Sequence, residues 1–251
     1  MHRPIGSLIA LLLLPAAAAA QTLAQRVAAL GEGSLRLSFA ARDGVCGNGG
    51  HSITIVSHDD ERDEWESDCA RGPVRVSLRV RGGRVEDAHT YVGGRWRAAD
   101  GRTTDLGTLP AGQAAYDLLA LAEQSRSDAE QLITAATLAD SAVVWPALLR
   151  IARRTELPED TRRQAVFWLG QAAGEAATRG LDSLAADSGG DLEVRKQAVF
   201  ALSQRPVDEG VPVLIRIARS NPHPELRKTA LFWLGQSEDP RAIALFEEIL
   251  R

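Results

Sequence analysis

The sequence predicts an α+β protein in which a small antiparallel β-sheet domain is followed by an α-solenoid of paired helices. From Gly33 to about Thr108, apolar and polar residues alternate with period two, whereas from Ala111 onward the apolar residues recur at helical spacing. A ten-residue pattern also returns in the second region, which is typical of repeat architectures. We therefore expect a β domain in residues 21–108 and the solenoid in residues 109–251.

The first twenty residues differ from the rest of the chain. The apolar run SLIALLLL follows a short start with Arg3, and Pro15 and an alanine-rich end come after it. The run is too short to span a bilayer, and the small residues that end at Ala20 suit cleavage by signal peptidase. We expect residues 1–20 to be a signal peptide, and the mature protein to be exported, periplasmic or extracellular, without stable membrane insertion.

The two cysteines, Cys46 and Cys69, are expected to form a disulfide. An oxidising compartment favours pairing, and two thiols allow one intramolecular bond. Free buried thiols are the alternative. We expect the bond to stabilise the β domain by about 3 kcal/mol, through the entropy that it removes from the unfolded chain.

The segment between these cysteines is strongly acidic, with seven carboxylates in Asp59–Asp68. Such a density can coordinate calcium, but the segment lacks the internal glycine and the ligand spacing of a calcium loop. His51 and His58 lack the spacing of a metal site. A solvated loop is the better interpretation, and we expect no metal and no cofactor.

Strands are predicted from the alternating segments. In VRVSLRVR, Val74 and every second residue after it share one face, and Arg75 and its alternates share the other. Gly82-Gly83 then predicts a tight hairpin into RVEDAHTYV. SLRLSFA and SITIV supply two further strands, and a second hairpin is expected at Gly93-Gly94, leading into Trp96. The result is a sheet of about four or five strands.

The helical region repeats internally. RRQAVFWLGQ returns as RKQAVFALSQ and RKTALFWLGQ, and aligning Gln164, Gln197 and Thr229 gives steps of 33 and 32 residues. WPALLRIAR and VPVLIRIAR also match each other. We expect a leading helix and about four helix pairs, at residues 112–124, 128–154, 161–187, 193–219 and 225–251.

These residues resemble a known family. EVRKQAVFALSQ, VPVLIRIAR and QSEDPRAIALFEEIL are similar to HEAT repeats of the short bacterial type, also called PBS-lyase HEAT-like repeats, over residues about 128–251. The resemblance implies an α-solenoid that serves as a scaffold or binding surface. Some HEAT proteins are iron enzymes with paired His-Glu motifs, but this sequence has no His-Glu pair, so that activity is not implied.

Each repeat places a phenylalanine opposite the apolar seam of its helix. With Val194 set at zero, Ala198 and Leu202 lie in the seam, whereas Phe200 falls at about 240°. Trp168 and Trp233 fall at the edge of the core. The outward positions of the three copies are nine candidate partner-binding residues: Arg163, Phe167, Gln171, Lys196, Phe200, Gln204, Lys228, Phe232 and Gln236.

Two interpretations of these phenylalanines stay open. Aromatic and cationic side chains aligned along a solenoid favour docking of an unknown protein or peptide. Alternatively, the rings pack against neighbouring repeats, or the β domain covers them.

The sequence contains no zinc-protease motif, nucleophile elbow or phosphate-binding loop, so no catalytic residues are expected. The net charge is −4, with both signs spread along the chain, so nucleic acid is not an expected partner. We therefore expect an exported, non-enzymatic protein-interaction scaffold. The alternative is an enzyme or accessory subunit with a site between the β domain and the solenoid.

Overall fold

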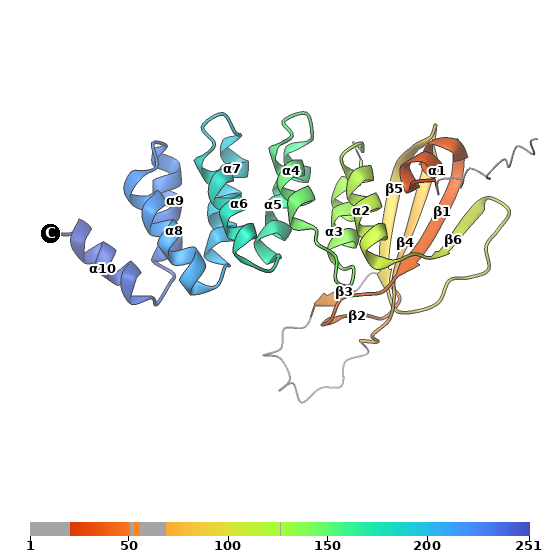
Figure 1. Cartoon of the computed structure of the whole chain (residues 1–251), viewed down its shortest axis with the longest axis horizontal. Helices are drawn as coiled ribbons and strands as arrows, with labels where there is room; N and C mark the ends of the chain where they lie inside the picture. The colour runs from red at the N-terminus through yellow and green to blue at the C-terminus, as the bar shows by residue number, and fades with distance from the viewer. Residues whose placement is uncertain (1–20, 51–52, 56–68, 126) are drawn as a thin grey trace, which may run out of the picture.

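The protein consists of a sheet at one end and an elongated array of helices that extends from it (Figure 1). This computed structural model describes residues 21–50, 53–55, 69–125 and 127–251. The signal peptide predicted for residues 1–20 and the acidic segment 59–68 lie outside the described residues.

Four strands form the main sheet, in the order β5-β4-β1-β6. Their bounds are β1 Glu32–Phe39, β4 Val74–Arg81, β5 Arg84–Val92 and β6 Thr103–Thr108. β4 pairs antiparallel with both β1 and β5, and its valines and leucine are buried while the alternate residues are not. Gly82 and Gly83 join β4 to β5 with φ of 58° and 69°, as a type I′ turn requires. The alternation and the hairpin predicted here are confirmed.

The fourth strand makes the sheet mixed, because β6 lies parallel to β1. The sequence predicted a hairpin at Gly93-Gly94 leading into Trp96, and that prediction is wrong, since no strand begins directly after these glycines to pair with β5. β5 and β6 lie at opposite edges of the sheet, so residues 93–102 must cross it before β6 begins. A hairpin cannot make a parallel pair, whereas a crossover connection can.

The predicted disulfide joins Cys46 to Cys69, with 5.2 Å between their Cα atoms. Cys46 lies in β2 (Val45–Gly47), which pairs with β3 (Ile53–Ile55) in a separate two-stranded sheet. The strand expected in SITIV is therefore present but is not part of the main sheet. Beside the disulfide, Gly47 and Ala70 exchange two backbone hydrogen bonds of 3.1 and 3.0 Å. The covalent bond thus reinforces a contact that the backbone also makes.

Helices cover the inner face of the main sheet. α1 (Leu23–Leu30) was not expected from the sequence; it begins with a capping box in which Thr22 and Gln25 exchange hydrogen bonds, and it buries Leu23 and Val27. α1 and α3 both contact β5. The buried apolar residues of the sheet and of the helices form one continuous core. The sheet and the array are therefore joined by packing as well as by the chain.

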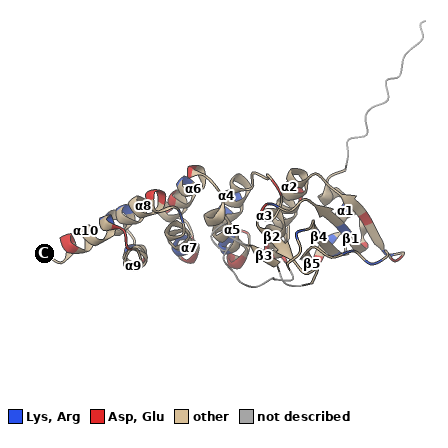
Figure 2. Cartoon of the chain, turned by 90° about the horizontal axis from the view of Figure 1, so that it is seen from below, with Lys and Arg blue, Asp and Glu red and all other residues tan. Residues whose placement is uncertain are grey.

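The remaining helices form two rows, seen from below in Figure 2. One row holds α3 (Ala129–Thr137), α5 (Glu159–Gln171), α7 (Leu192–Ser203) and α9 (Pro224–Leu234). The other holds α2 (Ala111–Ala122), α4 (Trp145–Arg153), α6 (Glu175–Ala186), α8 (Val207–Ser220) and α10 (Pro240–Ile249). In the described part of the chain, these helices form a leading helix and four packed helix pairs. Neighbours in the α3-to-α9 row contact each other more extensively than those in the other row, so the array curves toward α5, α7 and α9.

The arginine that opens each repeated pattern has a structural role. The Arg195 guanidinium donates two hydrogen bonds of 3.2 Å to the carbonyl oxygen of Ala185, at the end of the preceding helix. Arg227 donates to the carbonyl oxygen of Asn221 at 2.7 Å, and Arg162 donates to a loop carbonyl in the same way. Helix ends leave carbonyl oxygens without partners inside the helix. The repeated arginine therefore closes the loop before each of α5, α7 and α9.

A further buried arginine, Arg205, joins two successive repeats. Its Nε donates to the Thr178 hydroxyl at 2.8 Å, and its Nη2 lies 2.9 Å from a Glu209 carboxylate oxygen. Its remaining hydrogen bonds are to backbone carbonyl oxygens of Gly170, in the last turn of α5, and of Ala172 and Gly174 in the loop that follows. Hydrogen bonds from Thr178 and then from Arg205 lower the pKa of Glu209 below its usual value. Arg205 thus holds a loop of one repeat against the start of α8 in the next.

Candidate functional site

The nine candidate residues lie on or just after three neighbouring helices of the α3-to-α9 row. We call the surface that they form the first-row face. Seven of them are exposed, whereas Lys196 and Phe200 are half-buried. The set is Arg163, Phe167 and Gln171 on α5, Lys196, Phe200 and Gln204 on and just after α7, and Lys228, Phe232 and Gln236 on and just after α9. The structure therefore places the nine residues on one side of adjacent helices.

The three phenylalanines do not have the same surroundings. Phe167 is 37% exposed and Phe232 is 58% exposed. Each of these rings makes an edge contact with the tryptophan that follows it in sequence, at 5.2 and 5.0 Å between centroids. Phe200 instead packs across the repeat boundary onto Trp233 of α9, at 4.9 Å. Docking and internal packing, the two interpretations left open by the sequence, therefore apply to different members of the set.

A single difference between repeats explains why Phe200 packs on the next helix and Phe167 does not. The position of Trp233 is occupied by Ala201 in the preceding copy, so α7 offers Phe167 no indole to pack against. Ala201 instead allows close approach of the backbones, since a Cβ added to Gly170 of α5 would lie 2.9 Å from the Ala201 Cβ. Phe167 consequently retains an exposed edge while α5 and α7 are tightly packed.

The cations of the first-row face are partly neutralised on their own helices. Lys196 lies 3.1 Å from Glu193, and Arg163 has longer ion pairs with Glu159 and Asp160, at 3.9 and 3.8 Å. Lys228 has no ion pair among the residues that the structure describes. Exposed pairs of this kind contribute about 0 to 1 kcal/mol, so a partner can displace them at little cost.

A depression of about 320 Å³ lies beside Phe167. Its lining comes from α3, α5 and α7: Glu130, Asp160, Arg163, Gln164, Phe167 and Gln197. One aromatic edge is thus surrounded by charges of both signs and by amides. This arrangement suits an apolar side chain of a partner together with flanking hydrogen bonds.

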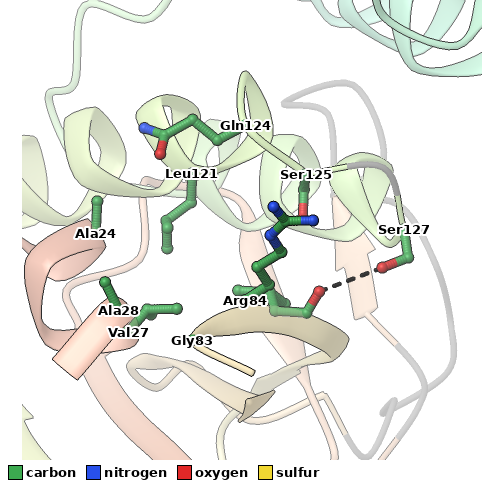
Figure 3. Close-up of a pocket in the computed structure, with 10 residues that line it drawn as sticks. Ala24, Val27, Ala28, Gly83, Arg84, Leu121, Gln124, Ser125 and Ser127 are labelled. Carbon is green, nitrogen blue, oxygen red and sulfur yellow. Dashed lines mark hydrogen bonds between the residues drawn. The ribbon is translucent and has the colours of Figure 1, made fainter. Parts of the chain in front are cut away.

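A larger cavity of about 620 Å³ lies where α1, the β4–β5 turn and α2 meet (Figure 3). Ala24 and Val27 come from α1, Leu121 from α2 and Gln124 from just after it, and Arg84 extends from the start of β5 toward Ser125. The described residues of its lining include no carboxylate, imidazole or thiol. This cavity is the nearest counterpart of a site between the two halves, and its described lining offers a cation and hydroxyls but no acid–base pair.

Two further findings concern the described part of the chain. There, no group of three or more His, Cys, Asp or Glu side chains is arranged to hold a metal ion. Nor does any described helix have the length and apolarity needed to cross a bilayer.

In comparison with known proteins, the C-terminal end of the array matches one family. Residues 183–251, which include α7 to α10, match the family model of HEAT repeats. The C-terminal part of the chain is thus built of HEAT repeats, as the resemblance implied. A search of curated proteins found no match to the chain. The paired-helix pattern itself begins earlier, at α3, one repeat before the first-row face starts on α5.

Two features of the surface were missed by sequence reasoning. The contact between Phe200 and Trp233 could have been inferred, because the alignment shows tryptophan at this position in the repeat that follows Phe200 and alanine in the repeat that follows Phe167. Arginines of the segment RWR gather with those of β1 and β4 on the outer face of the sheet. The density of arginine in GGRWRAADGR marks a cationic segment, but it does not show which strands this segment lies against.

Proposed function

We propose that this protein is an exported protein-interaction module that binds a peptide or helix of a partner protein on the first-row face, and that it acts by binding rather than by catalysis. HEAT-repeat domains generally serve as protein-interaction scaffolds. The observation that carries the proposal is the exposure of Phe167 and Phe232 on the inner, curved side of the array. Exposed aromatic side chains flanked by cations and amides are typical of binding hot spots.

Export is supported by two independent features. The segment 1–20 has the composition of a signal peptide, and Cys46 and Cys69 are paired. Amino-terminal sequencing of the protein from its native cells tests this part, with Gln21 expected as the first residue. An intact N-terminus on a protein from the cytosol would contradict export.

Site-specific photo-crosslinking tests the binding face. A photoreactive phenylalanine analogue at position 167 or 232 is expected to capture a discrete partner from the envelope or medium of the native organism. The same analogue at Tyr116, which is 65% exposed on α2, serves as the matched control. Crosslinks at both face positions and none at Tyr116 support the proposal. Identical products at the three positions would contradict it.

Substitution separates binding from folding. Phe167→Ser with Phe232→Ser is expected to abolish capture through a crosslinker at position 163 while the melting temperature changes little, because both rings are already exposed. Phe200→Ser is expected to destabilise the array by about 2 kcal/mol, since this ring is packed on Trp233. Unchanged capture by the double variant would show that the phenylalanines do not carry the interaction.

A further inference from the structure

The outer face of the main sheet carries another cavity, separate from the depression beside Phe167 and from the cavity at α1 and α2. Because β5 and β6 lie at opposite edges, the connection 93–102 crosses this face, and Trp96 lies over the Arg36 guanidinium at 5.3 Å and against Tyr91 at 6.1 Å. A cavity of about 460 Å³ lies among these elements. We call it the arginine pocket, and it is lined by Ser34, Arg36, Gly49, Arg75, Ser77, Tyr91, Gly93, Arg95, Trp96, Arg97 and Thr103.

Among the described residues, the lining of the pocket has an excess of positive charge. Arg36 is neutralised by Asp105 at 2.7 Å and also donates to the Arg97 carbonyl oxygen. The side chains of Arg95 and Arg97 have neither an ion pair nor a hydrogen bond within the described part of the chain, and no carboxylate is among the lining residues. Cations gathered in a concave site raise the local concentration of anions.

Arg75 supplies a donor that the fold does not use. Its Nη1 donates to the carbonyl oxygens of Gly93 and Pro73, which holds the guanidinium in place. Its Nε is buried and has no hydrogen-bond partner among the described residues. The edge of a guanidinium formed by Nε and Nη2 is one that binds carboxylates and phosphates with two parallel hydrogen bonds. A buried N–H without a partner is unfavourable, and an oxyanion at this edge would satisfy it.

The wall opposite the sheet is built by a close backbone crossing. Gly49 donates a hydrogen bond of 2.9 Å to the Val92 carbonyl oxygen, and a Cβ added to Gly49 would lie 2.8 Å from the Gly94 Cα. The segment that carries Cys46 is therefore pressed against the start of the connection 93–102. The disulfide at Cys46 thus anchors the segment that forms one wall of the pocket.

We propose that the arginine pocket binds a small organic oxyanion, in which a carboxylate or phosphate group pairs with Arg75 and Arg95 and an attached flat ring packs against Trp96 and Tyr91. Arginines select the oxyanion because their planar forks match its geometry. The two half-exposed aromatic side chains select the ring. This site lies on the sheet, apart from the first-row face, and does not depend on the function proposed for that face.

The test uses four probes with the mature protein: acetate, inorganic phosphate, benzoate and phenyl phosphate. Binding is followed by the chemical shift of the Trp96 indole N–H, assigned by its loss in Trp96→Phe. Benzoate and phenyl phosphate are expected to bind about tenfold more tightly than acetate and inorganic phosphate, respectively, because of the ring. The tighter of the two ring-bearing probes identifies the oxyanion as carboxylate or phosphate.

Variants locate the binding. Arg95→Gln with Arg97→Gln is expected to weaken the ring-bearing probes about tenfold without affecting the fold, since these exposed side chains make no described contact. The matched control is Arg71→Gln with Arg251→Gln, which removes the same charge outside the pocket and is expected to change affinity less than twofold. Arg75→Gln is expected to lose more binding than either pair. If Arg75→Gln does not fold, the double variant at Arg95 and Arg97 still tests the proposal.

Three outcomes would overturn the proposal. The first is the absence of any indole shift at millimolar probe. The second is equal weakening in the pocket and control pairs, which indicates a general charge effect. The third is equal affinity for a probe with its ring and without it, which removes the aromatic part of the site.

Discussion

The sheet and the helical array solve the same problem of burying apolar surface in different ways. Each helix of the array packs mainly on helices close to it in sequence, and the same contacts recur from one repeat to the next. The sheet closes over long distances instead, since β1 pairs with β4 and with β6, and the connection to β6 crosses the whole sheet. The array is therefore stabilised repeat by repeat, whereas the sheet depends on a few pairings between strands that are far apart in sequence.

Arg205 should give the largest effect, because it is the one described side chain that bonds to three backbone carbonyls, a hydroxyl and a carboxylate together. We expect Arg205→Ala to lower the free energy of unfolding by about 3 to 4 kcal/mol, measured by urea denaturation. Arg216→Ala is the control, since Arg216 makes an exposed ion pair with Asp182, and it should cost less than about 1 kcal/mol. Equal effects would show that the loops of the array are held by other contacts.

Removal of the disulfide should come next and should act on the other half. Cys46→Ser with Cys69→Ser is expected to cost about 3 kcal/mol, because the unfolded chain regains the entropy of an open loop. Hydrogen exchange should accelerate in β1, β4 and β5 and stay unchanged in α7 and α9. Equal acceleration in both regions would show that the sheet and the array unfold as a single unit.

Gly170 tests how closely the repeats must approach. A Cβ at this position meets the Ala201 Cβ at 2.9 Å, so Gly170→Ala is expected to cost about 1 to 2 kcal/mol. Gly112→Ala, at the start of α2, meets nothing within 4 Å and should stabilise the protein by about 0.5 kcal/mol. Thermal melting of the two variants should therefore shift in opposite directions. A rise for Gly170→Ala would mean that α5 and α7 separate without loss.

Protonation of single carboxylates at low pH should give the smallest loss of stability, and this loss should occur in both the sheet and the array. The pKa of Asp105 in the sheet is lowered by the Gly107 N–H and then by Arg36, as that of Glu209 in the array is lowered by Thr178 and Arg205. A carboxylate with a lowered pKa stabilises the fold above its ordinary value, 3.8 for Asp and 4.5 for Glu, and this stabilisation is lost as the pH falls below it. Asp105→Asn and Glu209→Gln should each flatten the loss of stability below about pH 4.5, monitored by circular dichroism. An unchanged acid limb in both variants would show that other carboxylates govern it.

The helical half was predictable because repetition resolves what one copy leaves ambiguous. Aligning three patterns separated Trp168, which is buried, from Phe167, which is exposed, although the two are adjacent in sequence. The partial burial of Phe200 does not follow from helix periodicity, which places a side chain on a face but does not show what the next helix presents to it; the tryptophan aligned in the next repeat was the signal for it.

The sheet was predictable only where it alternates. β4 and its hairpin follow from VRVSLRVR and Gly82-Gly83, whereas β6 is short, polar and paired with a strand far away in sequence. Positive φ at Gly93 and Gly94 is compatible with a hairpin as well as with a crossing. The choice between them depends on long-range pairing, and for the same reason no sequence pattern showed that Arg75 and Arg95 share a pocket.

The exchange of tryptophan for alanine at position 201 has one more consequence. A surface built from identical repeats would offer a bound chain the same contacts at every step along the array. Because Ala201 leaves Phe167 open while Trp233 covers Phe200, the three helices present unequal contacts in a set order. The contacts along the face therefore differ from step to step, and a peptide bound there is expected to prefer one register along the array.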